Sequence, residues 1–494
     1  MEQWVTAKLQ FNRTQMDELT RRLTTAFIEA RQRVGANKPT VLVSVTVPLQ
    51  LALEDIWRRI PLHTLSVSQF FWSSPRQERV LLGVGETQTL VVRGAERFDQ
   101  LKRAVKTLQS NWVYHETDKP KFLGGFSFQP GSRTGIWAGW EDGRFVLPRF
   151  LFEVNFGNKA ELTISEFLQV DQDPVEVSRE LVDELWTWVL EMGSEAGENF
   201  VSHPNEKFEA EDSLSQDGLP SKNRPRDLSR VDWEALVSYA VKQIQTGGLR
   251  KVVLARCQSL RFKKPISIPT VLNRLRERYP ESFTFSISAP SGSFTGASPE
   301  RLVRVENGVV DVDALAGTAA RGSTTDADDE LGRQLLNSIK DRTEHAVVVE
   351  RIRSEIAGLV QNISVPSVPV LKKLANVQHL FTPIQGRVDG TYSVIDFVAR
   401  LHPTPAVAGE PREVALDVIA EHEGLDRGWY ASPVGWFDPL GDGEFSVALR
   451  SALIQGEQAC LFAGAGIMAD SNPSLEWEET QMKLQAMRMA LMQE

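Results

Sequence analysis

Short runs of β-branched and aromatic residues, separated by tight turns, constrain the fold of this chain more than any other feature of its sequence. The runs 70–73 and 79–84 flank the turn 74–78 and predict a hairpin. Antiparallel strands accept such short connections, whereas parallel strands need long crossovers. The first 170 residues therefore predict an antiparallel sheet with helices on one face. Further strands are predicted at 41–47, 122–128, 145–152 and 161–164, and helices at 15–34 and 96–108.

The same mixture of strands and helices continues to the end of the chain, so we expect a mixed α/β (α+β) fold. Residues 199–230 are polar, contain three prolines and lack periodicity, which predicts a surface loop or linker. Strands are expected at 251–260, 283–289, 294–296, 302–306, 309–315, 428–437, 444–455 and 458–464. Helices are expected at 175–197, 233–246, 270–278, 329–359, 393–401 and 411–423.

Composition excludes several classes of protein. A net charge of −10 argues against non-specific nucleic-acid binding, which needs a basic surface. No run of eighteen apolar residues is present, so no membrane-spanning helix is expected. The N-terminus lacks the pattern of a secretion signal. Cys257 and Cys460 belong to no Cys-x-x-Cys motif, and two thiols in 494 residues predict a cytoplasmic protein.

Residues 464–483 combine an expected glycine loop with a charged helix. Gly464 and Gly466 would let backbone N–H groups approach an anion. Ser471 or Asn472 can cap the helix that follows, and Pro473 suits its first position. On that helix Glu476, Glu479 and Lys483 share one face, which suggests a divalent cation beside a carboxylate or phosphate ligand. A solvated helix face with a Glu–Lys pair is the plainer alternative.

Three further charged residues stand where chemistry is possible. Lys251 opens an apolar strand, and desolvation there would make it a base, although a lysine at a strand end also commonly points into water. Glu300 follows a proline in a turn between two strands, which suits a general acid or a solvated hairpin tip. Glu344 lies on an apolar helix side and needs a partner, either a metal or a basic residue such as Lys340 or Arg351.

Several motifs, taken together and in order, resemble those of the chorismate-utilising enzymes, which include isochorismate, salicylate, anthranilate and aminodeoxychorismate synthases. The resemblance is strong over residues 230–490 and weak before them. The matching segments are 251–256 (KVVLAR), 294–302 (FTGASPERL), 315–318 (LAGT), 340–345 (KDRTEH), 378–380 (QHL), 402–409 (HPTPAVAG), 430–435 (YASPVG), 463–467 (AGAGI) and 476–479 (EWEE) with Lys483.

This resemblance implies one large unit in which two halves with big antiparallel sheets pack together, with helices outside. Residues 1–200 would form the variable N-terminal part, 201–229 a loop or linker, and 230–494 the chorismate-binding catalytic region. The chain would be a monomer or homodimer.

By the same resemblance, most functional residues lie in the second half. Glu344 and Glu479 would bind Mg²⁺, with Glu476 close by. Lys251 would activate a water molecule and Glu300 would protonate the leaving hydroxyl. The substrate would be held by Thr318, His379, Tyr430, Arg450, Gly464, Gly466 and Lys483.

Three positions indicate which reaction of the family to expect. The water-adding members have a lysine at Lys251, which ammonia-using anthranilate synthases lack. Ala316 stands where aminodeoxychorismate synthases often carry a second lysine. Ala406 stands where anthranilate and salicylate types tend to have a hydroxyl residue. We therefore expect Mg²⁺-dependent isochorismate formation without a glutamine amidotransferase subunit.

The length of the N-terminal region favours the menaquinone-pathway type over a siderophore type. A salicylate synthase and an inactive chorismate-binding member are the alternatives.

Overall fold

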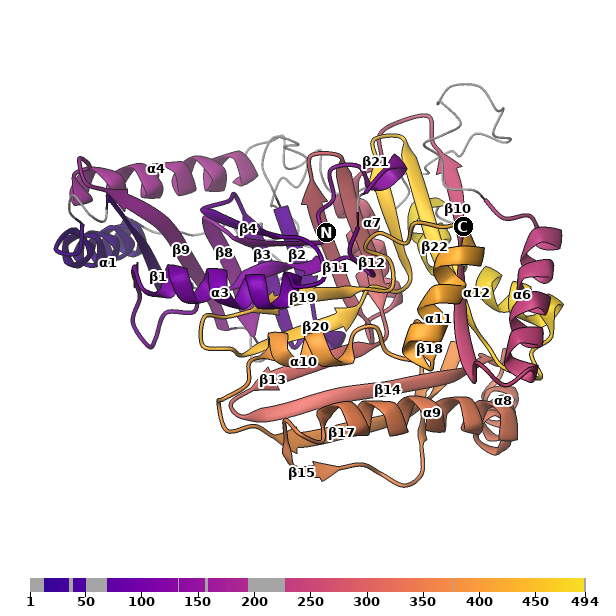
Figure 1. Ribbon diagram of the computed structural model, residues 1–494. Helices are drawn as coiled ribbons and strands as arrows, with labels where there is room; N and C mark the ends of the chain where they lie inside the picture. Colours follow the sequence, from indigo (N-terminus) through magenta and orange to yellow (C-terminus); the bar gives the residue numbers. More distant parts are fainter. Residues whose placement is uncertain are drawn as a thin grey trace.

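Two large sheets face each other in the computed structural model and carry helices on their outer sides (Figure 1). The structure describes residues 13–34, 39–49, 69–131, 133–155, 159–193, 227–375 and 377–492. Apart from the parallel pair of β1 (Thr40–Leu49) and β5 (Trp112–Val113), every strand pair in these ranges is antiparallel. The predicted mixed fold with large antiparallel sheets is therefore confirmed.

The larger sheet joins strands from both ends of the chain. β11 of the C-terminal part pairs with β2 of the N-terminal part, so the sheet is continuous across the expected linker. Its strand order is β18 (Gly409–Glu410), β10 (Lys251–Arg261), β22 (Gln458–Ile467), β21 (Ser451–Gln455), β12 (Gly292–Ser298), β11 (Phe283–Ala289), β2 (Gln69–Ser73), β3 (Arg79–Val84), β8 (Phe150–Asn155), β9 (Lys159–Gln169), β1 (Thr40–Leu49) and β5 (Trp112–Val113).

The smaller sheet is built in the same way, with β19 of the C-terminal part paired to β6 of the N-terminal part. Its order is β15 (Gln361–Ser364), β17 (Val377–Arg387), β14 (Val309–Ala320), β13 (Arg301–Glu306), β20 (Gly443–Val447), β19 (Pro433–Phe437), β6 (Phe122–Phe126), β7 (Gly143–Leu147) and β4 (Gln88–Val92), with β16 (Val370–Lys373) on β17. The expected linker, residues 201–229, lies outside the described residues except for 227–229.

The helices cover the sheets in groups that match separate apolar clusters. The apolar side chains of α1 (Arg13–Arg31) and α4 (Pro174–Gly193) pack against those of β1, β8 and β9 in one buried cluster. α7 (Ile268–Arg278) and α12 (Pro473–Met492) bury theirs against β21 and β22. The remaining helices are α3 (Arg97–Gln109), α6 (Arg230–Gln245), α8 (Thr325–Asn337), α9 (Ile339–Ile356), α10 (Val394–Leu401) and α11 (Arg412–Val418), which continues as a π-helical turn at Ile419–Glu423.

The chain crosses from one sheet to the other at short corners, and two strand predictions were wrong there. The expected strand 145–152 is β7 and β8, which belong to different sheets and are separated by Pro148 and Arg149. The expected strand 444–455 is likewise β20 and β21, with Arg450 at φ 48° in the corner. β12 and β13 change sheets through Pro299 and Glu300. These corners bring residues of both sheets to one place.

Two other predictions of local structure also need correction. The expected helix 329–359 is two helices, because Ser338 ends α8 and its hydroxyl accepts a hydrogen bond from the N–H of Asp341 to cap α9. Gly464 and Gly466 lie inside strand β22 and pair with Ala255 and Val253, so they do not form a loop. The predicted start of the closing helix is confirmed, since Asn472 accepts hydrogen bonds from the N–H groups of residues 474 and 475.

Candidate active site

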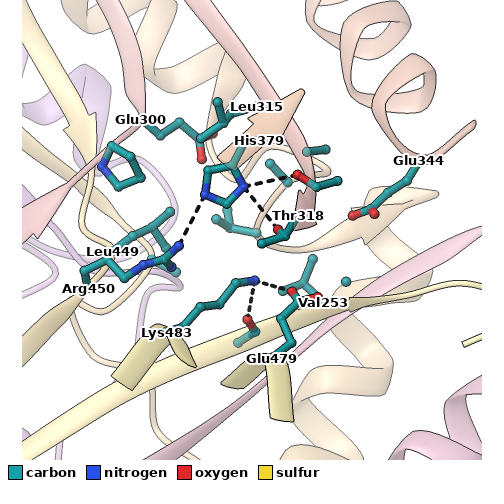
Figure 2. Close-up of a pocket in the computed structure, with 18 of the residues that line it drawn as sticks. Val253, Glu300, Leu315, Thr318, Glu344, His379, Leu449, Arg450, Glu479 and Lys483 are labelled. Carbon is teal, nitrogen blue, oxygen red and sulfur yellow. Dashed lines mark hydrogen bonds and ion pairs between the residues drawn. The ribbon is translucent and has the colours of Figure 1, made fainter. Parts of the chain in front are cut away.

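Eleven of the twelve predicted site residues line one pocket, although they are spread over more than 230 positions of the sequence. Strands of both sheets and the helices α9 and α12 form its wall, and Figure 2 shows side chains reaching it from several directions. The predicted residues in the wall are Lys251, Glu300, Thr318, Glu344, His379, Tyr430, Arg450, Gly464, Gly466, Glu479 and Lys483. Glu476 lies outside this lining. The fold therefore brings together, in one pocket, residues that are far apart in the sequence.

Lys251 is buried, so the alternative of a lysine pointing into water is wrong. Its side chain is 1% exposed, and its Nζ lies 2.8 Å from Oε1 of Glu344. Burial raises the pKa of Glu344, but Lys251, Lys483 and Lys340 together lower it overall. The close approach requires a glycine at position 466, because an added Cβ would lie 2.5 Å from that Oε1 and 3.1 Å from Cε of Lys251. Glu344 thus pairs with Lys251, not with Lys340 or Arg351 as its plainer alternative expected.

Glu300 occupies the corner between β12 and β13 and is 3% exposed. Burial raises the pKa of its carboxyl to about 8, and the negative charge of Asp313 adds to this effect. Among the described residues, no side chain donates a hydrogen bond to this carboxyl group. The backbone of Glu300 is fixed, because its N–H donates to Ser298 and its carbonyl accepts from Val447. A protonated carboxyl on a fixed backbone is what a general acid requires.

His379 is held as a neutral imidazole with a defined tautomer. Its Nδ1 lies 3.1 Å from the carbonyl oxygen of Gly317, which can only accept, so Nδ1 carries the proton. Thr318 Oγ1 lies at the same distance from Nδ1. Nε2 then accepts from the Arg450 guanidinium at 3.4 Å (Figure 2). Burial and the charge of Arg450 lower the pKa of His379 well below its usual value. The register shift between Ala316 and Thr318 turns Thr318 toward the pocket.

Two residues that line the pocket have left-handed backbone conformations. Ala431 has φ 60° and Arg450 has φ 48°, a region that non-glycine residues seldom adopt. Both line the pocket, next to Tyr430, whose ring stacks on Phe462 with 5.2 Å between the ring centroids. Burial raises the pKa of Tyr430 to about 12, which keeps its hydroxyl protonated. An added Cβ on Gly464 would lie 2.9 Å from the carbonyl oxygen of Leu254 and 3.2 Å from that hydroxyl, which explains the glycine at that position.

The carboxylates expected to bind metal are paired with lysines. Lys483 Nζ lies 2.5 Å from Oε1 of Glu479 and donates to the carbonyl of Gly464 at 2.9 Å (Figure 2). Glu476 is buried and accepts from Lys340 at 3.2 Å. Burial raises the pKa of Glu476, and repulsion from Glu479 raises it further. Within the described part of the chain, no three His, Cys, Asp or Glu side chains converge as a ready-made group of metal ligands, because these carboxylates face lysines.

Sequence reasoning missed Arg427, which lines the pocket and fastens its wall. Its guanidinium donates to the carbonyls of Val253 and Val407, both at 2.8 Å, and pairs with Glu423, which is also buried. Glu423 in turn accepts from the N–H of Ala255. The i, i+4 spacing of Glu423 and Arg427 was a usable signal, but the expected helix ended at residue 423, so the pair was not recognised.

The comparisons with known proteins agree with this geometry. The family model described as "Chorismate binding enzyme" matches residues 29–492. The chain is 36% identical over 435 residues to the isochorismate synthase MenF of Bacillus subtilis, covering 86% of this chain and 88% of that protein. It is 37% identical over 422 residues to the salicylate biosynthesis isochorismate synthase of Pseudomonas aeruginosa, covering 85% and 84% of the two chains.

Solved structures give the same result. The menaquinone-specific isochorismate synthase MenF of Escherichia coli superimposes with a TM-score of 0.73 at 26% identity, over 95% of this chain and 99% of that one. Anthranilate synthase component I of Streptococcus pneumoniae shares the fold, with a TM-score of 0.67. No helix in the described residues has both the length and the apolarity to cross a bilayer. The family model and the long alignments establish that this chain belongs to the chorismate-binding enzymes.

Proposed function

We propose that this protein is an isochorismate synthase, which converts chorismate to isochorismate by adding water at C2 and losing the C4 hydroxyl. The observation that carries the proposal is the pair Lys251 and Glu300 on one pocket, a buried amine and a carboxyl that holds its proton to about pH 8. The reaction needs one group that removes a proton and another that supplies one. The similarity to isochorismate synthases over more than four-fifths of the chain supports the same reaction.

The two side chains have complementary tasks in this reaction. Lys251 must first lose the proton it holds while paired with Glu344. The neutral amine then takes a proton from water as the water oxygen bonds to C2 and the ring double bonds shift. Glu300 donates its proton to the C4 hydroxyl, which leaves as water, so one water enters and one departs. Both groups return to their starting states after proton exchange with solvent. Because water is the nucleophile, this reaction requires no amidotransferase partner.

The remaining wall residues suit an anionic substrate. Lys483 and Arg450 bring positive charge into the pocket. Neutral His379 does not compensate the Arg450 charge, because it accepts a hydrogen bond without adding a negative charge. Tyr430 offers a hydroxyl donor to the same region. We assign Arg450 and Tyr430 to the enolpyruvyl carboxylate, and Thr318 and His379 to the side of the ring.

Magnesium binding belongs to the proposal, with Glu344 and Glu479 as ligands and Glu476 acting nearby. Carboxylate oxygens are the donors that Mg²⁺ prefers. Burial raises the pKa of Glu476 and repulsion from Glu479 raises it further, which supports a cation here, since a positive ion would relieve that repulsion. When bound, Mg²⁺ would hold the ring carboxylate of the substrate. Glu344 and Glu479 would first have to give up their lysine partners.

Menaquinone biosynthesis is the pathway that we propose. The full-length match to the menaquinone-specific enzyme of Escherichia coli supports it. The isochorismate synthase EntC of Escherichia coli aligns with only 52% of this chain. Chain length alone does not decide, because the Pseudomonas aeruginosa salicylate-pathway relative also aligns over 85%. Restored growth of a menaquinone-deficient strain that lacks its own isochorismate synthase would support this assignment.

Product analysis tests the activity directly. Purified protein is incubated with chorismate and Mg²⁺ in ¹⁸O-labelled water, with and without ammonium, and the products are separated by chromatography. We expect isochorismate with one labelled oxygen at C2, no aminated product, and loss of turnover in EDTA or in Lys251→Ala. Salicylate with pyruvate would place the protein in the lyase branch of the family. Absence of any product would support the inactive binding member.

A further inference from the structure

The corner that carries Glu300 is fastened from both sides by cationic side chains. Lys372 on β16 donates to the carbonyl of Pro299, the residue before Glu300, at 2.6 Å. Arg301, the residue after Glu300, donates from Nε to Glu444 at 2.8 Å. Both cations come from the smaller sheet, which the chain enters at this corner.

Asp313 on β14 lies between these two cations. Its Oδ2 lies 3.3 Å from Nζ of Lys372, and its Oδ1 lies 3.6 Å from Nη1 of Arg301. The Asp313 side chain is only 6% exposed, so these contacts are shielded from solvent. One buried carboxylate therefore ties together both flanks of Glu300.

The charges facing Glu300 come from four elements and act in opposite directions. After burial, the Asp313 carboxylate is the next largest cause that raises the pKa of Glu300. Lys372 on β16, Lys251 on β10 and Arg450 at the β20–β21 corner lower it. Around Asp313 itself stand Arg301, Lys372 and, through Arg301, Glu444. Asp313 is the anion that opposes the three cations.

We propose that Asp313 and Lys372 are positioning residues for the general acid: Asp313 anchors the corner and keeps Glu300 protonated, and Lys372 limits this effect while holding the Pro299 carbonyl. The inference rests on the proposed acid role of Glu300. Neither residue lines the pocket, so neither contacts substrate. Their influence acts through the position and protonation of Glu300, which makes opposite effects expected when each charge is removed.

The test is an infrared titration of the Glu300 carboxyl in the full-length protein without substrate. The band of the protonated acid is assigned by its loss in Glu300→Gln and followed against pH. We expect Asp313→Asn to lower the pKa of Glu300 by about one, and Lys372→Met to raise it by a similar amount. With chorismate at pH 8, we expect Asp313→Asn to reduce kcat about fivefold and leave KM nearly unchanged.

Asp311→Asn is the matched control. Asp311 lies two residues away on the same strand, is equally buried and hydrogen-bonds Arg304 and Gln385. Its charge reaches Arg301, but it is not among the charges that shift the pKa of Glu300. It should leave the pKa of Glu300 unchanged. Equal shifts in Asp311→Asn and Asp313→Asn, or shifts of the same sign in Asp313→Asn and Lys372→Met, would overturn the inference.

If Asp313→Asn does not fold, the pKa of Glu300 in Lys372→Met alone tests the proposal. An unchanged or lowered pKa of Glu300 in that variant refutes the assignment. Because the titration needs no turnover, its failure is separate from failure of the product assay that tests the proposed activity.

Discussion

The carboxyl of Glu300 links the chemistry of the pocket to the stability of the protein. Its pKa is about 8 in the folded chain and 4.5 in the unfolded reference. Between these values the folded state holds a proton that the unfolded state has lost, so stability falls as pH rises from about 4.5 to 8. Below about pH 4.5 the carboxyl of Glu300 does not lower the free energy of unfolding. Above about pH 8 the cost is fully present, at most about 5 kcal/mol.

Glu300→Gln removes this cost and the acid together. We expect the variant to melt at the same temperature as the wild type at pH 4.5 and at a higher temperature at pH 9. Its kcat should fall about 100- to 10,000-fold, because glutamine cannot supply the proton. Scanning calorimetry across this pH range and steady-state kinetics measure both effects. A variant that melts lower than the wild type at pH 9 would show that the carboxylate is stabilising, contrary to its burial.

A substitution at Gly466 is expected to change the activity and leave the stability unchanged. A Cβ at this position would meet Oε1 of Glu344 at 2.5 Å, which is the far end of a flexible side chain that can move. We therefore expect Gly466→Ala to retain its melting temperature and lose about 10- to 100-fold in kcat, because the Lys251–Glu344 geometry shifts. Gly358→Ala, where an added Cβ meets nothing within 4 Å, is the control. Wild-type kcat in Gly466→Ala would contradict a role for that geometry.

Residue types in order were enough to select the site, but not to describe it. The motifs around Lys251, Glu300 and Glu344 indicated one chemistry because the family resemblance connected them. Burial of Lys251 and its pairing with Glu344 depend on strands and helices far apart in the sequence, so local patterns could not reveal them. Asp313 was missed because alternation with valines on its strand is typical of a solvated face, whereas here that face is buried.

Corners between the sheets explain which elements were predicted well. Strands bounded by turns, such as β2 and β3, matched their predictions, since a hairpin is decided locally. The runs 145–152 and 444–455 are mostly apolar, and their composition does not show where the chain leaves one sheet for the other. The corner at Arg450 requires a left-handed residue, yet it carries an arginine where glycine would be the usual signal. Here local conformation is set by the packing of both sheets.

The π-helical turn after α11 ends at Glu423, which forms a buried ion pair with Arg427. Arg427→Lys keeps the charge but cannot bond Glu423 and the carbonyls of Val253 and Val407 together. We expect a loss of about 3–5 kcal/mol in unfolding free energy and a raised KM, because the wall at Val407 loosens. Arg230→Lys, in an exposed pair, should cost under about 1 kcal/mol. Urea denaturation compares the two, and equal costs would argue against a special role for the turn.

The pocket draws residues from both sheets and from α9 and α12, so a ligand bound there should stabilise the whole molecule. Without a ligand, Glu344 and Glu479 are held by lysines, and repulsion from Glu479 adds to burial in raising the pKa of Glu476. Binding to the folded state alone adds about 2.7 kcal/mol at a hundredfold excess over Kd. We therefore expect Mg²⁺ with chorismate to raise the melting temperature of the catalytically silent Lys251→Ala variant, in which the substrate is not consumed.

Glu479→Gln in the same background should lose most of that rise, since it removes one proposed ligand of the cation. Glu478→Gln changes the neighbouring residue, which is exposed and pairs with Arg230, and should keep the rise. The comparison needs no turnover, so it examines the metal site apart from the acid and base. If Glu479→Gln and Glu478→Gln respond alike, Glu479 is no ligand and its pairing with Lys483 is a structural contact. If only Glu479→Gln loses the response, the carboxylates of α9 and α12 act as one cation site that joins the two sheets through the substrate.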